Sequence, residues 1–137
     1  MKTLIAIVAL AALPLWAAAQ PIGMRESDGV RWVCGGVGEE ERESLAAFRP
    51  EANLSLLFVA GKRGAYLADV AVSLYAAGSK TPRLEFRADG PMCLLRAAPG
   101  RYRIEASLNG VKRAADAEVT RGAKQPARAV FVFPEQE

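Results

Sequence analysis

The chain has 137 residues, of which 51% are hydrophobic and 24% charged, and its formal net charge at pH 7 is +3. This length suits one domain with a modest core, and so small a net charge gives no reason to expect a nucleic-acid partner. The sequence contains no histidine, which excludes imidazole-activated serine or cysteine nucleophiles and histidine-bound zinc, copper or iron sites.

Residues 1–19 differ in composition from the rest of the chain. Lys2 gives a short positive start, residues 4–15 are almost continuously apolar, and residues 17–19 are alanines that suit a cleavage site. We therefore expect a signal peptide that is cleaved near Ala19, and a mature protein in the periplasm or secreted. A membrane span needs about 20 apolar residues, and no later stretch has them, so no transmembrane segment is expected after cleavage.

Residues 20–29 are polar and rich in turn-forming types, which predicts a flexible lead-in to a single domain over residues 30–137. The first strand is expected at Val30–Cys34. A glycine-rich loop then leads to a helix at Glu39–Phe48, and the proline two residues later cannot continue that helix.

The glycine-rich loop before the helix does not have the spacing of a nucleotide-binding loop. The helix starts with Glu39, Glu40 and Glu41, and these carboxylates would repel a phosphate at the helix N-terminus. No nucleotide site is therefore expected. The glycines are interpreted as a turn that lets the helix pack back on the sheet.

Seven further segments are predicted to be strands because apolar and polar residues alternate in them, or because a short apolar run is bounded by turn residues. They are Leu54–Val59, Asp69–Tyr75, Arg83–Ala88, Met92–Ala97, Arg101–Leu108, Val111–Val119 and Ala129–Phe133. About seven to eight strands with one short N-terminal helix predict a mostly β fold, an antiparallel β-sandwich of the immunoglobulin-like kind.

The clearest of these strands lies between Pro99-Gly100 and Asn109-Gly110. Its apolar residues, from Tyr102 to Leu108, occupy every second position, so one face is predicted to lie in the core and the other in water. Asn-Gly is the strongest short hairpin signal, which predicts that Val111–Val119 pairs with this strand.

Two cysteines, Cys34 and Cys93, are the only ones in the chain. An exported protein with an even number of cysteines favours a disulfide, and only one intramolecular pairing exists here. On the chain-entropy model the bridge would stabilise the fold by about 4 kcal/mol. No CxxC pair is present, so redox activity is not expected, and two thiolates alone make a poor metal site.

Catalytic patterns are weak in this sequence. Ser79-Lys80 are adjacent and lie on a predicted turn, unlike the spaced serine and lysine of a catalytic dyad. The carboxylates Asp69, Glu85 and Asp89 lie at turns or alternate with arginines, where structural roles are expected. We therefore expect no catalytic residue, no cofactor and no metal. A hydrolase-like enzyme that uses carboxylates without histidine is the alternative.

Basic residues are concentrated in the C-terminal half: Lys80–Arg128 holds 11 Lys/Arg against 5 Asp/Glu. Most of these charges lie at alternate strand positions, which predicts a solvated outer face. The alternative is a basic surface that meets phosphate-rich envelope material.

The tetrapeptide DVAV at 69–72 and the stretch LLRAAPGRYRIEASLNG at 94–110 resemble carboxypeptidase regulatory-like domains, which are transthyretin-like sandwiches. The resemblance spans residues 67–119 and implies a module that binds or stabilises a neighbour. Small exported proteobacterial proteins that carry this domain alone have a similar N-terminal piece. Transthyretin-like hydroxyisourate hydrolases depend on histidines and a Tyr-Arg-Gly-Ser tail, and intradiol dioxygenases bind iron through two histidines and two tyrosines. Neither activity is expected here, because the chain lacks histidine and ends in FPEQE.

Together these observations predict an exported, non-catalytic module that recognises another envelope protein or a polysaccharide. The expected contact surface consists of loop tips, because loops on a rigid scaffold commonly carry recognition. An assembly subunit that pairs through exposed strand edges is a further alternative. The contact residues that we predict are Lys62, Arg63 and Tyr66 in the loop at 62–66, and Arg83 in the loop at 81–83.

Overall fold

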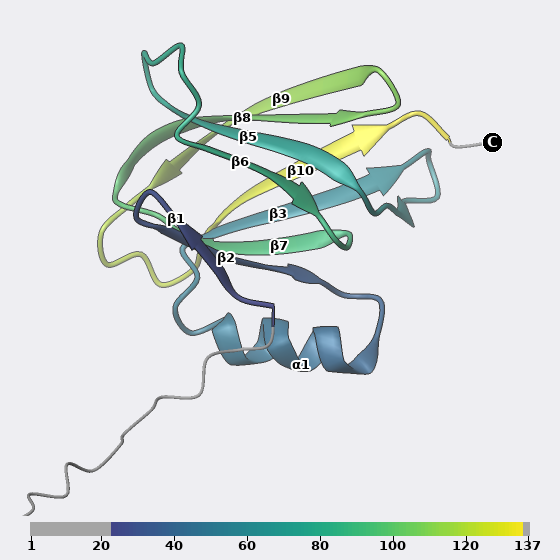
Figure 1. Cartoon of the computed structure of the whole chain (residues 1–137), viewed down its shortest axis with the longest axis horizontal. Helices are drawn as coiled ribbons and strands as arrows, with labels where there is room; N and C mark the ends of the chain where they lie inside the picture. The colour runs from purple at the N-terminus through teal and green to yellow at the C-terminus, as the bar shows by residue number, and fades with distance from the viewer. Residues whose placement is uncertain (1–22, 136–137) are drawn as a thin grey trace, which may run out of the picture.

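The computed structural model describes residues 23–135, in which two β-sheets pack face to face and one helix covers part of the outer side of one sheet (Figure 1). This arrangement confirms the predicted mostly β sandwich with one short helix. The signal peptide expected at residues 1–19 lies outside the described residues. Within the described residues, no helix is long and apolar enough to cross a membrane.

The described residues form ten strands and one helix, and the two strands beyond the predicted number, β1 and β4, are very short. The elements are β1 (Arg25–Ser27), β2 (Val30–Gly35), α1 (Glu39–Phe48), β3 (Leu54–Ala60), β4 (Ala65–Tyr66), β5 (Val70–Ala76), β6 (Leu84–Ala88), β7 (Met92–Arg96), β8 (Gly100–Leu108), β9 (Val111–Val119) and β10 (Ala127–Phe133).

The first sheet has the order β1-β2-β7-β3-β10, with β4 also paired to β3, and the second has the order β6-β5-β8-β9. All strand pairs are antiparallel except β3 and β10, which run parallel from Leu54↔Ala127 to Ala60↔Phe133. The parallel pair departs from the predicted antiparallel pattern. It follows from the path of the chain, because the connection after β9 returns to the end of the sandwich where β3 begins.

The core lies between the two sheets and is built by the alternating residues of facing strands. In β8, Tyr102, Ile104 and Ala106 are buried as predicted. In the parallel pair, Phe58 and Phe131 stand in register with their ring centroids 5.5 Å apart. A full burial of such side chains contributes about 1.5–3 kcal/mol each, so this layer is the main source of stability.

Helix α1 covers the outer face of β2 and β7, where Leu45 and Phe48 form a second small core with Val33 and Leu94. The close approach depends on Gly35, because a Cβ atom there would lie 2.8 Å from the Cβ atom of Glu41. Of the glycines before α1, Gly35 is thus the one that allows the helix to pack closely on the sheet.

The start of α1 is occupied by its own glutamate. The Glu41 carboxylate accepts hydrogen bonds from the backbone N–H groups of Val37 and Gly38, at 3.1 and 3.2 Å. The first turn of α1 thus supplies its own capping carboxylate.

Residues 25–32 form a hairpin that begins within the segment 20–29, where a flexible lead-in is expected; residues 20–22 of that segment lie outside the described residues. Strand β1 pairs with β2, and the turn between them is Asp28-Gly29, with φ angles of 49° and 77°. A two-residue turn with both φ angles positive matches the twist of paired strands, and Asp-Gly is among the dipeptides that adopt it most easily. The sequence does not predict the Asp28-Gly29 turn, because the residues before it are polar and lack the alternating apolar pattern of a strand.

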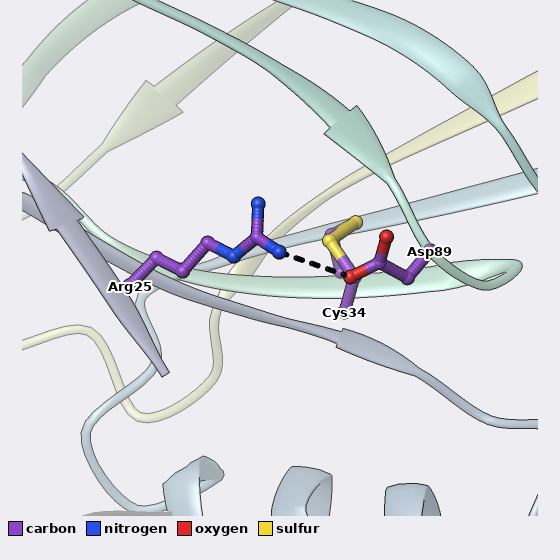
Figure 2. The surroundings of a disulfide bond; sticks show 4 residues. Arg25, Cys34 and Asp89 are labelled. Atoms are coloured by element: carbon purple, nitrogen blue, oxygen red, sulfur yellow. Dashed lines mark ion pairs between the residues drawn. A yellow bond between two sulfur atoms is a disulfide. The ribbon is translucent and has the colours of Figure 1, made fainter. Parts of the chain in front are cut away.

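The predicted disulfide is present between Cys34 on β2 and Cys93 on β7, which are direct neighbours in register with a Cα–Cα distance of 4.1 Å. Figure 2 shows this bond together with the ion pair between Arg25 and Asp89, whose Nη2 and Oδ2 atoms are 3.7 Å apart. The pair links β1 to the turn after β6, so it joins the edges of the two sheets near the disulfide. Both of its side chains are largely exposed, so its own contribution is small.

Candidate ligand-binding groove

A groove of about 940 Å³ lies at one end of the sandwich. Its walls are three connections: the segment from α1 to β3, the turn from β7 to β8, and the loop at 120–126 between β9 and β10. In Figure 1 this is the left end, where the loop after β9 turns back toward the start of β10. Segments that are far apart in the sequence thus meet at one site.

Five cationic side chains line this groove, and none of the described residues that line it is acidic. They come from β2, the end of α1, β7 and the β9–β10 loop. Positive charges gathered in a concave site attract anions, because the protein walls reduce the screening by water. The five residues, called the basic groove residues below, are Arg31, Arg49, Arg96, Arg121 and Lys124.

Two of these residues, Arg31 and Arg96, lie directly opposite each other on β2 and β7. Like charges at directly opposed positions destabilise a strand pair. Glu51 offsets this repulsion, because its Oε2 atom lies 3.1 Å from Nη1 of Arg31 and its backbone carbonyl accepts a hydrogen bond from Nη1 of Arg96 at 3.2 Å. A carboxylate beside the groove thus already contacts one of its guanidinium groups.

The other three basic groove residues, Arg49, Arg121 and Lys124, make no ion pair within residues 23–135. The outer face of the second sheet differs in this respect. There Arg101 pairs with Glu118 at 3.9 Å, and Arg103 with Glu105 at 3.1 Å. Carboxylates thus lie beside several cations of that sheet, whereas in the groove lining only Arg31 has an ion-pair partner.

Asn53 fixes the wall of the groove. Its side chain donates to the Ala97 carbonyl at 2.7 Å and accepts from the Ala97 N–H at 2.9 Å. Its backbone donates to the carbonyl of Leu95 and accepts from the N–H of Ala127, at 2.9 and 3.0 Å. One residue thus ties the α1–β3 connection to the end of β7 and to the start of β10, which holds the groove open on a rigid frame.

The remaining lining of the groove consists mainly of small residues, and none of the described lining residues is aromatic. Their short side chains leave the backbone and the arginine planes as the main contact surfaces. The small residues of the lining are Gly29, Pro50, Ala52, Ala97, Ala98, Pro99, Gly122, Ala123 and Pro126.

The structure places three of the four predicted contact residues at one end of the sandwich and the fourth at the other end. Lys62 and Arg63 lie in the turn after β3, and Tyr66 lies on β4 with 71% of its surface exposed, so these three are at the end of the sandwich opposite the groove. Arg83 precedes β6 at the groove end, where its Nε atom is 3.9 Å from Oδ2 of Asp28, but it does not line the groove.

Sequence reasoning missed the groove because its cations are not neighbours in the chain. Arg31 occupies an outward position of a predicted strand, and Arg49 follows the helix, so each looks like an ordinary solvated charge. The basic excess of the C-terminal half did contain Arg96, Arg121 and Lys124. Only the strand order, which places β2 beside β7 and the start of β10 beside β3, shows that all five meet.

The three carboxylate residues considered for catalysis each have a different structural setting. Asp89 pairs with Arg25, while Asp69 has a φ of 62° and its carbonyl accepts a hydrogen bond from Arg87 at 3.3 Å. Glu85 stands on the exposed face of β6. Over residues 23–135, no group of three or more His, Cys, Asp or Glu side chains is placed to hold a metal ion.

A comparison of the chain with models of known protein families finds no match, and a comparison with curated protein sequences finds none either.

Proposed function

We propose that this protein is an exported, non-catalytic module that binds another component of the cell envelope in the groove at the end of its sandwich. The observation that carries the proposal is the gathering of five cations from four elements in one groove with no acidic lining residue. Charges of one sign in a concave site raise the local concentration of an oppositely charged partner.

Two features support export. The composition of residues 1–19 is that of a signal peptide, and the Cys34–Cys93 bond is of a kind that forms and persists in oxidising compartments. The resemblance of residues 67–119 to carboxypeptidase regulatory-like domains supports a binding role, because that resemblance implies a module that assists a neighbour. The sandwich and the Asn109-Gly110 hairpin are compatible with that resemblance.

The proposal is tested by expressing the full chain in a Gram-negative bacterium and determining where it accumulates and with what mass. We expect the protein in the periplasmic fraction, with a mass that corresponds to a start near Gln20. The purified mature protein is then immobilised and offered separated envelope polysaccharide, protein and lipid fractions. Retention of a component by the wild type, and its loss in the variant R31Q/R96Q, is the expected result. An uncleaved cytoplasmic chain would refute export, and no retention from any fraction would refute the binding role.

A further inference from the structure

We propose that the ligand of the groove is a polysaccharide chain that carries repeated phosphate or carboxylate groups. This inference rests on the proposed function and adds the chemistry of the ligand. The shared feature of the two ligand types is an anionic oxygen at intervals along a sugar chain.

The first step is the chemistry of the cations. Four of the five basic groove residues are arginines, whose planar guanidinium groups match phosphate and carboxylate oxygens in paired hydrogen bonds. The contact of 3.1 Å between Arg31 and Glu51 places a carboxylate oxygen on one of these groups within the molecule itself. A ligand carboxylate or phosphate can replace it there with the same geometry.

The second step concerns Arg31 and Arg96. Their direct opposition on β2 and β7 is unfavourable for the sheet, and Glu51 balances it only in part, with one carboxylate against two guanidinium groups. Local arrangements that cost stability commonly occur at functional sites. An anion between these arginines would remove the repulsion, which makes the pair the expected centre of the binding site.

The third step is the number and spread of the cations. A groove of about 940 Å³ is near the upper end of the range for small-molecule sites, about 300–1,000 Å³. Its cations come from β2, from the residue that follows α1, from β7 and from the loop at 120–126, so they lie around the groove and not at a single point. One small anion would contact few of them, whereas a chain with repeated charges engages them together.

The fourth step distinguishes a polysaccharide from a protein or a membrane. Protein partners usually insert aromatic or large aliphatic anchors into fitted pockets, and the small side chains and arginines of the described lining offer no such pocket. Binding to a membrane surface commonly uses apolar side chains that enter the lipid, and the large exposed apolar residues, Val37, Tyr66, Val130 and Val132, do not line the groove. A thin, hydrated, charged chain fits a concave surface of backbone and arginine.

The test measures binding of the mature protein to defined probes by isothermal titration calorimetry. The probes are polygalacturonate, a phosphorylated mannan, neutral dextran, poly-glutamate, and vesicles of phosphatidylcholine with phosphatidylglycerol. We expect binding to one or both charged polysaccharides, weakening as salt rises, and none to dextran. The two charged polysaccharides separate the carboxylate source of the anion from the phosphate source.

Two variants with equal loss of charge locate the site. R31Q/R96Q should weaken binding at least about tenfold, since each hydrogen bond between charged groups contributes about one such factor. K62Q/R63Q removes two cations at the opposite end, which are contact residues predicted from the sequence. Binding in the groove replaces that prediction and requires this variant to bind like the wild type. Thermal unfolding of both variants shows whether they are folded. A third variant, R121Q/K124Q, changes only the exposed loop at 120–126 and should also weaken binding, without altering the sheet.

The outcomes separate this inference from the proposed function. Preferential binding to poly-glutamate, to vesicles or to dextran would overturn the anionic polysaccharide while leaving a binding module. Equal loss of binding in K62Q/R63Q would overturn the groove as its site. Failure of all probes, combined with retention of an uncharged envelope component through the groove, would also overturn the inference and keep the proposed function.

Discussion

At the scale of single residues, Glu51 holds the two opposed arginines of the groove, Arg31 and Arg96. Its carboxylate contacts Arg31 and its carbonyl holds Arg96, so it keeps two like charges in place without a ligand. The same carboxylate competes with any ligand anion for Arg31. Glu51 is therefore expected to lower affinity and to preserve the shape of the site at the same time.

This role predicts the behaviour of Glu51→Gln. Affinity for a charged polysaccharide should rise several-fold, because the competing charge is gone while the backbone carbonyl still holds Arg96. Stability should fall by about 1 kcal/mol or less, since both side chains of the ion pair are partly exposed to solvent. Calorimetric titration and urea unfolding measure the two effects. Glu118→Gln, which removes the partner of Arg101 on the second sheet, is the matched control and should leave affinity unchanged.

Asn53 acts on the groove through the backbone. Replacing it by Ala removes the two side-chain hydrogen bonds to Ala97 and should destabilise the protein by about 1–3 kcal/mol, because the partner groups are partly buried. Amide hydrogen exchange should accelerate at Ala97 and Ala127 more than in β5 or β8. Uniform acceleration across both sheets would show that Asn53 stabilises the whole fold and not this wall in particular.

At the scale of elements, the close contact between α1 and the sheet depends on Gly35, the last residue of β2. Gly35→Ala should destabilise the protein by about 1–3 kcal/mol, because the new methyl group would lie 2.8 Å from the Cβ atom of Glu41 and the helix would have to shift. Gly38→Ser is the control, since nothing lies within 4 Å of a Cβ atom there and serine suits the N-cap position that Gly38 occupies. Urea unfolding of the two variants checks the difference; equal losses would contradict the steric argument.

The elements show how far sequence patterns reach in this chain. Alternation and turn residues predict α1 and β9 with their observed bounds, and the hairpin at Asn109-Gly110, because these signals are local. The parallel pairing of β3 and β10 has no local signal, since it depends on where the loop at 120–126 returns. The groove is missed for the same reason. Its cations become neighbours only through the strand order.

At the scale of the whole molecule, the first sheet is joined along its length by strand pairing and, at Cys34 and Cys93, by a covalent bond. The cysteines are 59 residues apart in the chain, and the loop that they close contains α1 and all strands from β3 to β6. A cross-link of this span restricts the unfolded chain strongly while adding no contact to the groove.

The variant C34A/C93A should therefore lose about 4 kcal/mol of unfolding free energy, and less if the reduced unfolded chain keeps residual structure. The removed bond joins the register pair Cys34–Cys93, whereas the groove arginines Arg31 and Arg96 form another register pair of the same two strands, at the end away from the helix start. Affinity for a charged polysaccharide should therefore stay within about twofold of the wild type at a temperature where the variant is folded. Urea unfolding and calorimetric titration of the same preparation measure both quantities. Loss of binding in a variant that is shown to be folded would mean that the cross-link sets the distance between Arg31 and Arg96. The four hydrogen bonds of Asn53 would then be insufficient to keep the groove in its binding shape.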